Sequence, residues 1–392
     1  MNYVLFDDKT HQNLLPLTFT RPVSDIRIGI LSITEKWKHH LGKEISFLTQ
    51  DYLRKKFPLV EEKENCLING SILPDQNLVN AINTLKNNEL LVKNEIIIAC
   101  LQANSATFPI INDSNFSKIE YHFDLLKINY PEDIFSFNAE ALKRDFELLT
   151  KGRKSAVLNS TNTVLGNNIF VEEGAIVSCS IINTETGPVY IGKDAEIMEG
   201  CIIRGPFALC EYAGLKMGAK IYGATTVGPY SKVGGEVNNS VIFGFSNKGH
   251  DGFLGNAVIG EWCNLGADTN NSNLKNNYAE VRLWDYNKKS FRKTGLQFCG
   301  LIMADHAKCG INTMFNTGTV IGVSANVFGS GFPRNFIPDF AWGGASGFET
   351  YLPVKAAEVA ERVFERRSKK FDDTERELLE TVFELTKSYR NF

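Results

Sequence analysis

A short stretch of the chain, residues 248–274, places a histidine among glycines and amides and is the first candidate for chemistry. It reads KGHDGFLGNAVIGEWCNLGADTNNSNL and contains His250, Phe253, Asn264 and Asn273. A histidine has a reference pKa of about 6.5, so it can accept a proton from a reacting group at neutral pH. Asparagine amides can hydrogen-bond hydroxyl or carbonyl oxygens without adding charge. The alternative interpretation is a surface histidine in a glycine-rich loop.

Basic residues near this stretch would be needed if the substrate carries a phosphate. Lys248 and Lys232 are the predicted phosphate contacts, and Arg282 is a weaker candidate. Farther along, residues 323–343 leave the surrounding rhythm and carry several aromatic side chains with Arg334. That segment suits either a phosphate contact or a capping loop.

These residues are embedded in a strict repeat of six. Aliphatic side chains recur at every sixth position: Ile191, Ile197, Ile203, Leu209, Leu215, Ile221, Val227 and Val233. A helix repeats every 3.6 residues and a strand every two, so this period indicates a hexapeptide β-solenoid whose short strands each point one aliphatic residue inward. The period returns at Met303, Cys309, Phe315, Ile321 and Val327.

The repeat predicts about ten three-sided coils of about 18 residues each over residues 153–345. It is interrupted at 234–252 and at 270–302, where we expect loops on the outside of the solenoid, since such loops often carry function. A metal-dependent solenoid enzyme would need three histidine ligands at one interface. Of the six histidines only His250 and His306 lie in the repeat region, which disfavours that class.

Residues 1–152 have a different rhythm, in which short apolar strands alternate with helices. Strands are predicted at 3–6, 44–49, 66–70 and 95–100, and helices at 30–41, 76–87 (capped by Asp75) and 139–150. This alternation predicts an α/β domain with a parallel sheet, whose ligands bind at the carboxyl ends of the strands. Asp7, Asp8, Arg21 and Arg27 lie near that edge and are candidates for a phosphate and metal site. Alternatively, the two arginines pair with local carboxylates or lie at the domain interface.

Residues 346–392 are predicted to form a helical tail. Two helices are expected at 356–370 and 374–389, and Thr374 has the capping-box spacing to Glu377. The apolar side chains of Leu378, Val382 and Leu385 share one face of the second helix. We expect this face to pack on the solenoid or on a neighbouring subunit.

The composition is that of an ordinary globular protein, with 43% hydrophobic and 22% charged residues and a net charge of -3. This charge predicts binding to neither nucleic acid nor a membrane surface. The apolar runs are shorter than the ~20 residues needed to cross a bilayer, and the first residues, MNYVLFDDKT, do not predict a signal peptide. The eight cysteines lack metal-ligand spacing and predict reduced thiols in a cytoplasmic protein.

The stretch 248–274 resembles the acetyltransferase domain of the bifunctional N-acetylglucosamine-1-phosphate uridylyltransferase/glucosamine-1-phosphate acetyltransferase family. The family's spacing is matched by His250, Phe253 with Leu254-Gly255, Asn264, Gly266-Ala267-Asp268-Thr269 and Asn273. The resemblance covers residues 150–345. It implies a left-handed β-helix, a homotrimer with sites between neighbouring solenoids, and acetyl-coenzyme A as the donor.

The same resemblance implies roles for single residues. His250 would be the general base, and Asn264 and Asn273 would bind the sugar or the acetyl donor. Apart from the resemblance, the 3′-phosphate of acetyl-coenzyme A would suit Arg334. Phe253 and Leu274 stand where the family has tyrosines, which removes two hydroxyl contacts. Asp268 replaces a glycine at a corner, where a positive φ would strain the backbone.

The N-terminal stretch LLPLTFTRP, residues 14–22, resembles sugar-nucleotide pyrophosphorylase domains, in which a similar stretch follows a phosphate-binding loop. Here that loop, DDKTHQN, contains neither glycine nor arginine. Asn69-Gly70-Ser71 stands where the family has Gly-Asp with a Mg²⁺-binding aspartate, while Asn138 matches a family position near the second metal ligand. The resemblance implies a shortened domain that would need Mg²⁺ only if it transfers nucleotides.

Three regions are therefore predicted: a short Rossmann-like, nucleotidyltransferase-type α/β domain at 1–152, a left-handed parallel β-helix at 153–345 and a helical tail at 346–392. The resemblance implies acetyl transfer from acetyl-coenzyme A to the amine of glucosamine 1-phosphate or a close amino-sugar phosphate. Such an enzyme would serve the synthesis of UDP-N-acetylglucosamine and cell-envelope precursors. The alternatives are a sugar-1-phosphate nucleotidyltransferase, alone or as part of a bifunctional enzyme, and a non-catalytic scaffold that binds sugar nucleotides.

Overall fold

The computed structural model describes residues 1–108 and 113–392. The chain divides into two compact units. The first comprises Met1–Leu14, Thr20–Ile26 and Leu31–Tyr130, and the second comprises Leu15–Phe19, Arg27–Ile30 and Pro131–Phe392. Two short N-terminal segments therefore belong to the same unit as the solenoid.

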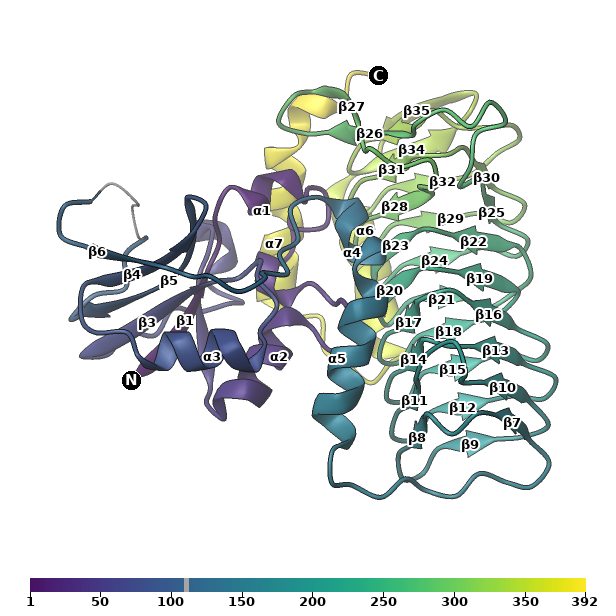
Figure 1. Ribbon diagram of the computed structural model, residues 1–392. Coiled ribbons are helices and arrows are strands. Elements are labelled where there is room, and N and C mark those ends of the chain that lie inside the picture. The colour runs from purple at the N-terminus through teal and green to yellow at the C-terminus, as the bar shows by residue number, and fades with distance from the viewer. Residues whose placement is uncertain (109–112) are drawn as a thin grey trace. The chain divides into compact units, whose positions relative to one another are not determined.

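The first unit is built on a six-stranded sheet in the order β2-β1-β3-β5-β4-β6 (Figure 1). Its strands are β1 (Asn2–Phe6), β2 (Ile45–Leu48), β3 (Glu64–Asn69), β4 (Glu89–Lys93), β5 (Ile96–Ala103) and β6 (Ser117–Glu120). The four predicted strands are confirmed as β1, β2, β3 and β5. Val4, Phe6, Leu67 and Leu90 are buried in its core.

The prediction of a parallel sheet is wrong for part of this unit. β1 is parallel to β2 and β3, but β5 is antiparallel to both of its neighbours, β3 and β4. The cause is a hairpin between β4 and β5, whose turn residues Asn94 and Glu95 have φ of 47° and 66°. Tight hairpins need positive φ at these positions and usually carry glycine there, so the glutamate concealed the turn in the sequence.

The helices of the first unit are α1 (Thr10–Asn13), α2 (Ile33–Leu41) and α3 (Gln76–Asn83), with 3₁₀ turns η1 (Val23–Asp25) and η2 (Asp51–Leu53). Ser32 and Glu35 form a capping box at the start of α2, which ends at Gly42 with φ of 61°. Asp75 caps α3 as predicted, since its carboxylate accepts a hydrogen bond from the N–H of Leu78 at 2.8 Å. Both helices are shorter than predicted.

The second unit contains a parallel β-helix with three long sheets of six, nine and ten strands (Figure 1). The six-stranded sheet comprises β7 (Thr163–Leu165), β10 (Ile181–Asn183), β13 (Ile202–Arg204), β16 (Lys220–Tyr222), β19 (Glu236–Asn238) and β22 (Phe253–Gly255). The nine-stranded sheet comprises β8 (Ile169–Val171), β11 (Val189–Ile191), β14 (Phe207–Leu209), β17 (Thr225–Val227), β20 (Val241–Gly244), β23 (Val258–Glu261), β28 (Leu301–Met303), β31 (Thr319–Ile321) and β33 (Phe336–Ile337). The ten-stranded sheet comprises β9 (Ile176–Val177), β12 (Glu196–Ile197), β15 (Gly214–Leu215), β18 (Lys232–Val233), β21 (Asn247–Lys248), β24 (Asn264–Leu265), β29 (Lys308–Cys309), β32 (Asn326–Val327), β34 (Ala341–Gly344) and β35 (Gly347–Thr350).

The six-residue period marks the interior of this β-helix, as predicted. Ile191 pairs with Leu209, and Leu209 with Val227, so that aliphatic residues stack from coil to coil. All of the periodic residues lie in one buried cluster. Burying each aliphatic side chain stabilises the fold by roughly 1.5–3 kcal/mol, and the gain exists only while neighbouring coils are stacked.

The first interruption of the period is not an external loop, as was predicted, but a shortened coil. Residues 234–252 contain β19, β20 and β21, which pair in register with the preceding coil. Ser246 donates its N–H to the Oγ of Ser231, only 15 residues earlier, where a regular coil has about 18. The shorter coil shifts the inward positions away from the six-residue count, which made the pattern appear broken.

The second interruption forms a loop outside the β-helix, as predicted. β25 (Asn270–Asn271) pairs with β30 (Met314–Phe315), and between them β26 (Arg282–Asp285) and β27 (Ser290–Lys293) form an antiparallel hairpin. Arg292 of the hairpin holds Glu132 through two hydrogen bonds of 2.5 Å. Both side chains are almost fully buried.

Residues in the left-handed backbone conformation form the corner between the nine-stranded and the ten-stranded sheet. Tyr212, Tyr230, Phe245 and Trp262 have φ between 52° and 61°, and their rings stack with centroids 4.8, 4.9 and 4.2 Å apart. Phe364 continues the stack at 3.9 Å from Trp262. Because Phe364 lies on a C-terminal helix, this aromatic ladder attaches that helix to the β-helix.

The helices of the second unit are α4 (Pro131–Ser136), α5 (Asn138–Thr150), α6 (Pro353–Glu365) and α7 (Asp373–Leu385), with the 3₁₀ turn η3 (Lys387–Tyr389). The predicted capping box at Thr374 is wrong, because Asp372 caps α7 by accepting a hydrogen bond from the N–H of Glu375. Leu385 was predicted to be packed but is 50% exposed, while the neighbouring Leu379 is buried.

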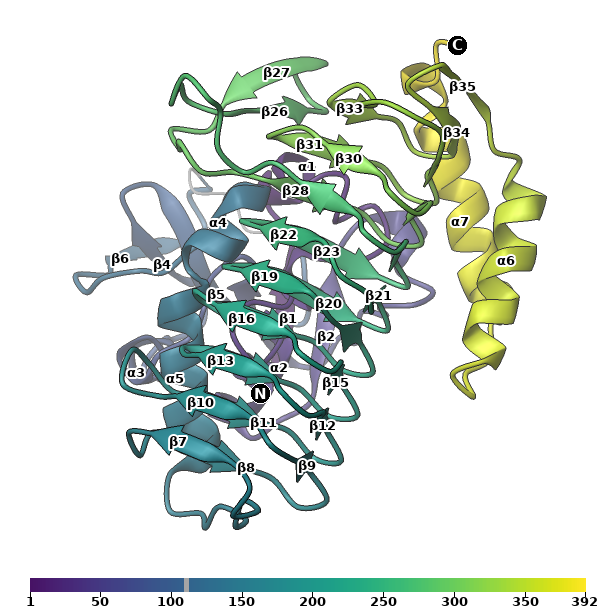
Figure 2. The ribbon, with the colours of Figure 1, turned by 90° about the vertical axis from the view of Figure 1, so that its right-hand side faces the viewer.

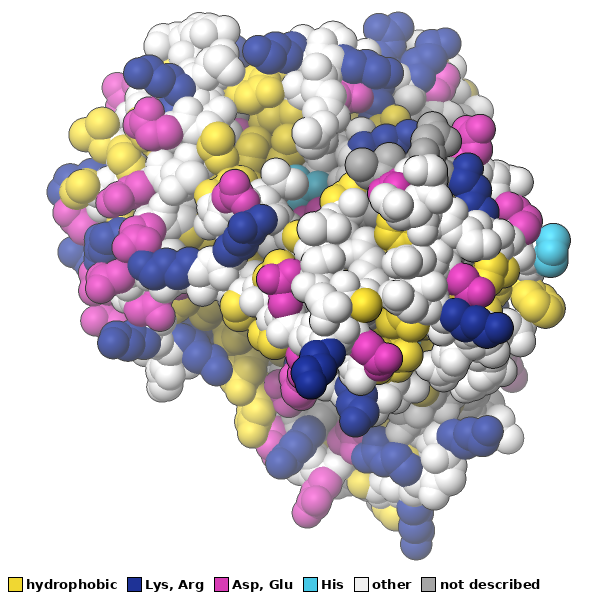
Figure 3. All heavy atoms as spheres, turned by 90° about the vertical axis from the view of Figure 1, so that its left-hand side faces the viewer, with side chains coloured by type: hydrophobic (Ala, Val, Ile, Leu, Met, Phe, Trp, Pro, Cys, Tyr) yellow, Lys and Arg dark blue, Asp and Glu magenta, His cyan; other side chains and the backbone are white. Residues whose placement is uncertain are grey.

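The predicted fold class, an α/β domain followed by a parallel β-helix and C-terminal helices, is confirmed. Of the described helices, none is long and apolar enough to cross a membrane. On the face shown in Figure 3, basic and acidic side chains lie interspersed.

Candidate functional site

His250 lies on a tight connection between β21 and β22, where the chain passes from the ten-stranded to the six-stranded sheet. Its side chain is exposed. Gly252 beside it has φ of +111°, and a Cβ there would lie 2.2 Å from the carbonyl oxygen of Thr269. The loop therefore presses closely on the next coil and presents the imidazole to the outside.

Lys248 supports this loop from inside the β-helix. It pairs in the strand ladder with Val233 and thus occupies an inward position that aliphatic residues fill in other coils. Its ammonium donates to the carbonyl oxygens of Gly234, His250 and Asp251 at 3.1, 2.8 and 3.3 Å. Burial lowers the pKa of Lys248 to about 8, against the opposing effect of Asp251 and Asp268.

The coil that follows fixes the loop through asparagine side chains. Asn270 Oδ1 accepts the N–H of Phe253 at 2.8 Å, and Asn271 binds both the N–H and the carbonyl of Gly255 at 2.9 and 3.0 Å. The residue that replaces a family glycine, Asp268, has φ of 55°, as the sequence suggested. Its N–H donates to the carbonyl of Asp251 at 3.1 Å.

Phe253 and Asn273, both predicted to bind substrate, are brought together over Gly255. A Cβ at Gly255 would lie 2.5 Å from the Phe253 ring and 2.7 Å from Asn273 Nδ2. Asn273 also donates to Asn256 Oδ1 at 2.8 Å. The ring and the amide therefore lie close to each other on this side of the β-helix.

Asn264 and Lys232 lie on a different side of the prism. They occupy β24 and β18 of the ten-stranded sheet, on either side of Asn247 in β21. All three alternate with inward residues, and Asn264 is exposed. The predicted residues thus form two groups, with His250 at the corner where the two sides meet.

A residue that the sequence did not indicate joins the second group. Arg367, which follows α6, donates to Asn247 Oδ1 at 2.9 Å. Burial lowers the pKa of Lys232, and repulsion from Lys216 and Arg367 lowers it further, while Glu196 opposes this. No spacing in the sequence connects the C-terminal segment to β21, so Arg367 could be found only from the structure.

Arg334 lies in the last coils and is stacked between two aromatic rings. Its guanidinium carbon is 5.1 Å from the ring centroid of Phe348 and 5.5 Å from that of Phe392. The side chain is exposed and lines a cavity of about 550 Å³. Arg282 is exposed on β26 and does not line that cavity.

In the first unit, Asp7 and Asp8 follow β1 as predicted, and each oxygen of both carboxylates has a partner. Asp7 accepts hydrogen bonds from the N–H of Val23 and from the hydroxyl of Thr49. Burial raises the pKa of Asp7 to about 7, although these hydrogen bonds oppose the shift. At neutral pH the carboxyl is therefore close to half protonated.

Asp8 belongs to a small polar cluster with a lysine that the sequence did not indicate. It accepts hydrogen bonds from the N–H of Thr10 at 2.8 Å and from Asn69 at 3.0 Å, and Lys127 Nζ lies 3.6 Å away. Burial alone would raise the pKa of Asp8, but Lys127 and the hydrogen bonds lower it overall. Lys127 lies on no motif, which is why sequence reasoning missed it.

The other predicted residues of this site are engaged elsewhere. Arg21 is buried and lies 3.5 Å from Asp25, as the alternative interpretation predicted. Arg27 and Asn138 belong to the second unit. Arg27 donates to the carbonyl of Phe243 at 3.0 Å, and Asn138 is fully buried, accepting from Gly29 N–H at 2.7 Å and donating to the carbonyl of Ala224 at 2.8 Å.

These residues do not fit a Mg²⁺ ion. Mg²⁺ prefers ionised carboxylates, whereas burial raises the pKa of Asp7 to about 7 and the ammonium of Lys127 lies 3.6 Å from the carboxylate of Asp8. In residues 1–108 and 113–392, no cluster of three or more histidine, cysteine, aspartate or glutamate side chains could hold a metal ion.

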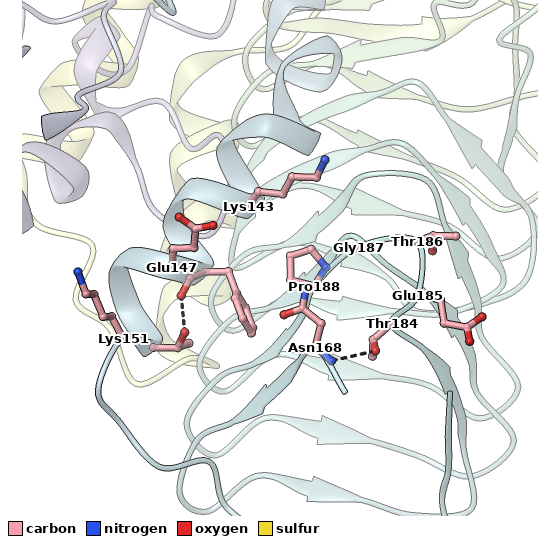
Figure 4. Close-up of a pocket in the computed structure, with 11 residues that line it drawn as sticks. Lys143, Glu147, Lys151, Asn168, Thr184, Glu185, Thr186, Gly187 and Pro188 are labelled. Atoms are coloured by element: carbon pink, nitrogen blue, oxygen red, sulfur yellow. Dashed lines mark hydrogen bonds between the residues drawn. The ribbon is translucent and has the colours of Figure 1, made fainter. Parts of the chain in front are cut away.

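A second hollow of about 710 Å³ lies between α5 and the first coils (Figure 4). Lys143, Glu147 and Lys151 line it from α5 and its end, and Thr184 and Glu185 line it from the first coils. It contains none of the predicted site residues, and its charges are of both signs.

The N-terminal part of the chain, residues 3–154, matches the family model described as sugar nucleotidyl transferase. The chain is 29% identical over 263 residues to a bifunctional sugar-1-phosphate nucleotidylyltransferase/acetyltransferase of Sulfurisphaera tokodaii. The aligned region covers 65% of this chain and 59% of that protein. It is 34% identical over 87 residues to the bifunctional protein GlmU of Methanocaldococcus jannaschii, over 22% of this chain and 21% of that protein. A solved structure, the UDP-N-acetylglucosamine acyltransferase of Francisella novicida, aligns with 58% of this chain and 90% of that chain at 12% identity, with a TM-score of 0.31.

The fold places the chain in the class of hexapeptide-type parallel β-helices, and residues 3–154 are similar to the sugar nucleotidyl transferase family model. Within that class, the resemblance to the bifunctional nucleotidylyltransferase/acetyltransferases is confirmed. The chain spans 21% of the length of the Methanocaldococcus jannaschii relative and 59% of the length of the Sulfurisphaera tokodaii relative.

Proposed function

We propose that the chain transfers acetyl from acetyl-coenzyme A to the amine of glucosamine 1-phosphate or a closely related amino-sugar phosphate. The observation that carries this proposal is the His250 loop, which exposes an imidazole while Lys248 and Asn270 fix the backbone on either side of it. A rigid support of this kind suits a proton-transferring group, because its position must hold within a fraction of an ångström.

In the proposed reaction the neutral amine attacks the thioester carbonyl. A C–N bond forms, the C–S bond breaks, and the amine proton passes to His250, while the coenzyme leaves as a thiolate that is then protonated. Removal of the proton by a positioned histidine typically accelerates such a step by 10²–10⁴-fold. The coenzyme supplies the activated acetyl group, and the residues of the chain hold the two substrates and accept the proton.

We propose that Phe253 and Asn273 contact the sugar, because they lie together beside His250 on one side of the prism. Lys232 and Asn264, on the adjoining side, would bind the phosphate or the acetyl donor together with Arg367. Lys248 was predicted to contact the phosphate, and its carbonyl partners support a role in positioning the loop instead. Arg334 remains the proposed contact for the coenzyme 3′-phosphate.

We further propose a homotrimer in which the six-stranded sheet faces a neighbouring copy. Its strands lie in front in Figure 2, uncovered by any described helix. Ile181 and Ile202, which are paired in this sheet, are 45% and 50% exposed and form a short apolar strip. Leu165 and Tyr222 are further exposed apolar residues of the same sheet. Exposed apolar strips of this kind are typical of subunit interfaces. The buried free thiols also suit a cytoplasmic location.

The substrate is tested by measuring free-thiol release from acetyl-coenzyme A with a series of acceptors. Glucosamine 1-phosphate is expected to support release, whereas N-acetylglucosamine 1-phosphate, which lacks the free amine, is expected to support none. Release with glucosamine but not with its 1-phosphate would refute the phosphate contacts. Absence of release with every amino-sugar phosphate would refute the acetyl-transfer proposal.

A second function, nucleotidyl transfer by the N-terminal unit, is favoured by the family match over residues 3–154. The engaged carboxylates of Asp7 and Asp8 argue against it. The test is Mg²⁺-dependent pyrophosphate release from UTP or dTTP with N-acetylglucosamine 1-phosphate. Sugar-nucleotide binding without turnover in either assay would instead support the scaffold alternative.

A further inference from the structure

A cavity of about 550 Å³ opens at the C-terminal end of the β-helix. It lies between the inserted β26–β27 hairpin, the segment 334–338 and the final residues 388–391. Its volume is within the range of about 300–1,000 Å³ that small-molecule sites occupy. Three segments far apart in sequence thus converge on one hollow.

The walls of this cavity are aromatic. Trp284 stacks on Phe336 with ring centroids 4.2 Å apart and an angle of 10° between the planes. Phe291 meets Trp284 edge-on at 5.3 Å, and Tyr389 meets Phe336 edge-on at 6.3 Å. Phe291 is 42% exposed. Because Trp284 and Phe336 each cover a face of the other, the exposed ring of Phe291 is the surface on which a planar ligand ring could stack, and such stacking is worth about 1–3 kcal/mol for a nucleobase.

The charge of the cavity is positive. Arg334 and Lys289 line it, and among the described lining residues none is acidic. Two carboxylates near Tyr389 have other partners: Asp285 accepts the N–H of Lys288 and lies 3.9 Å from Arg292, and Asp339 accepts the hydroxyl of Tyr286 at 2.8 Å. Two cations without a carboxylate partner in the cavity favour an anionic ligand.

The cavity is separate from the His250 loop. β33 at the cavity and β20, the strand that precedes β21, are separated in the nine-stranded sheet by β31, β28 and β23. Four strand spacings of about 4.8 Å correspond to about 19 Å along the prism. A ligand in the cavity therefore does not need to contact the imidazole.

We propose that this cavity is a nucleotide site, with the base stacked on the aromatic wall and the phosphate held by Arg334 and Lys289. Two sources share this chemistry: the 3′-phosphoadenosine part of a coenzyme A thioester, and a free or sugar-linked uridine or thymidine nucleotide. The proposal of a nucleotide site is argued from the cavity and does not depend on acetyl transfer. Only the assignment of the nucleotide to coenzyme A rests on the proposed function.

The test is isothermal titration of the full chain with adenosine 3′,5′-bisphosphate, uridine 5′-monophosphate, adenosine and inorganic phosphate. At least one nucleotide is expected to bind at least tenfold more tightly than adenosine or phosphate alone. Arg334→Gln and Lys289→Gln are each expected to weaken its binding by about tenfold, as the loss of a charge-assisted hydrogen bond implies. Arg366→Gln and Lys293→Gln, which change exposed residues outside the cavity, should leave the affinity unchanged.

Each outcome decides the proposal. Preference for adenosine 3′,5′-bisphosphate supports the site with the coenzyme as its source, and preference for uridine 5′-monophosphate supports it with a sugar nucleotide. Binding of no nucleotide, phosphate binding as tight as nucleotide binding, or affinities unchanged by both cavity variants would overturn it. Failure of thiol release with intact nucleotide binding would refute only the proposed acetyl transfer.

Discussion

At the scale of single residues, two buried ionisable side chains have opposite tasks. Lys248 replaces an aliphatic residue in the interior of the β-helix and donates hydrogen bonds to the loop that carries His250. Asp7 lies in the N-terminal unit, where burial raises its pKa to about 7. The lysine supports a candidate site, whereas the aspartate makes the stability of its unit depend on pH.

The pH dependence at Asp7 has a definite sign. Between about pH 4 and pH 7 the folded chain keeps the proton and the unfolded chain loses it, so this carboxyl contributes stability that falls as pH rises through the window. About three pKa units correspond to at most about 4 kcal/mol. The melting temperature of Asp7→Asn minus that of wild type should therefore be larger at pH 8 than at pH 5. Melting curves of both proteins at pH 5 and pH 8 measure this difference. The exposed Asp124→Asn control should show the same difference from wild type at both pH values. The same result for Asp7→Asn would contradict the prediction.

At the scale of elements, the loop between β21 and β22 depends on a glycine pair flanking His250. Gly252 has positive φ and no room for a Cβ, while a Cβ at Gly249 would meet nothing within 4 Å. Gly252→Ala is therefore expected to destabilise the fold by roughly 2 kcal/mol or more, and Gly249→Ala by less than about 1 kcal/mol. Thermal melting of the two variants measures this difference. Equal melting temperatures would show that the loop is not held as described.

The segment after α6 supplies Arg367 to the sheet that carries Lys232 and Asn264. If these residues bind the substrate phosphate, Arg367→Met should raise KM for glucosamine 1-phosphate by about tenfold with little change in kcat. Arg366→Met, a change in the exposed neighbouring residue, is the matched control. A fall in kcat at unchanged KM would show that Arg367 acts on the loop or the fold instead.

The elements differ in how far the sequence predicted them. The repeat was legible because each inward position, such as Ile191 or Leu209, must be aliphatic to stack on its neighbours. The shortened coil at 234–252 escaped because its inward residues Val237 and Ile242 fall off the six-residue count, and because its third inward position is Lys248. The β4–β5 hairpin escaped because Glu95 adopts a backbone conformation typical of glycine.

The candidate site was predictable only in part. His250, Phe253 and Asn273 form a local constellation, and the structure places them on one loop and the coil next to it. Arg367 contacts Asn247, 120 residues earlier in the chain, and Lys127 contacts Thr10, 117 residues earlier. Contacts between residues so far apart leave no pattern in the local sequence. The sequence gives residue types, but long-range contacts depend on how coils and helices pack.

At the scale of the whole molecule, the proposed trimer follows from an exposed apolar sheet face. Ile181→Asp with Ile202→Asp places two charges in the strip and should convert a trimer to monomers without melting the fold, because both side chains point outward. Val354→Asp, at an exposed apolar position on α6, is the control. Sedimentation velocity distinguishes the species. A trimer that survives the double substitution would exclude this face as the interface.

The β-helix exposes His250, and the acidic residues of the N-terminal unit do not fit a metal ion. We propose that His250 accepts the proton during acetyl transfer. The most direct test is the rate of thiol release with acetyl-coenzyme A and glucosamine 1-phosphate for wild type, His250→Ala and the exposed control His122→Ala. We predict a loss of at least about 100-fold for His250→Ala and wild-type activity for the control. Equal rates for wild type and His250→Ala would contradict the account.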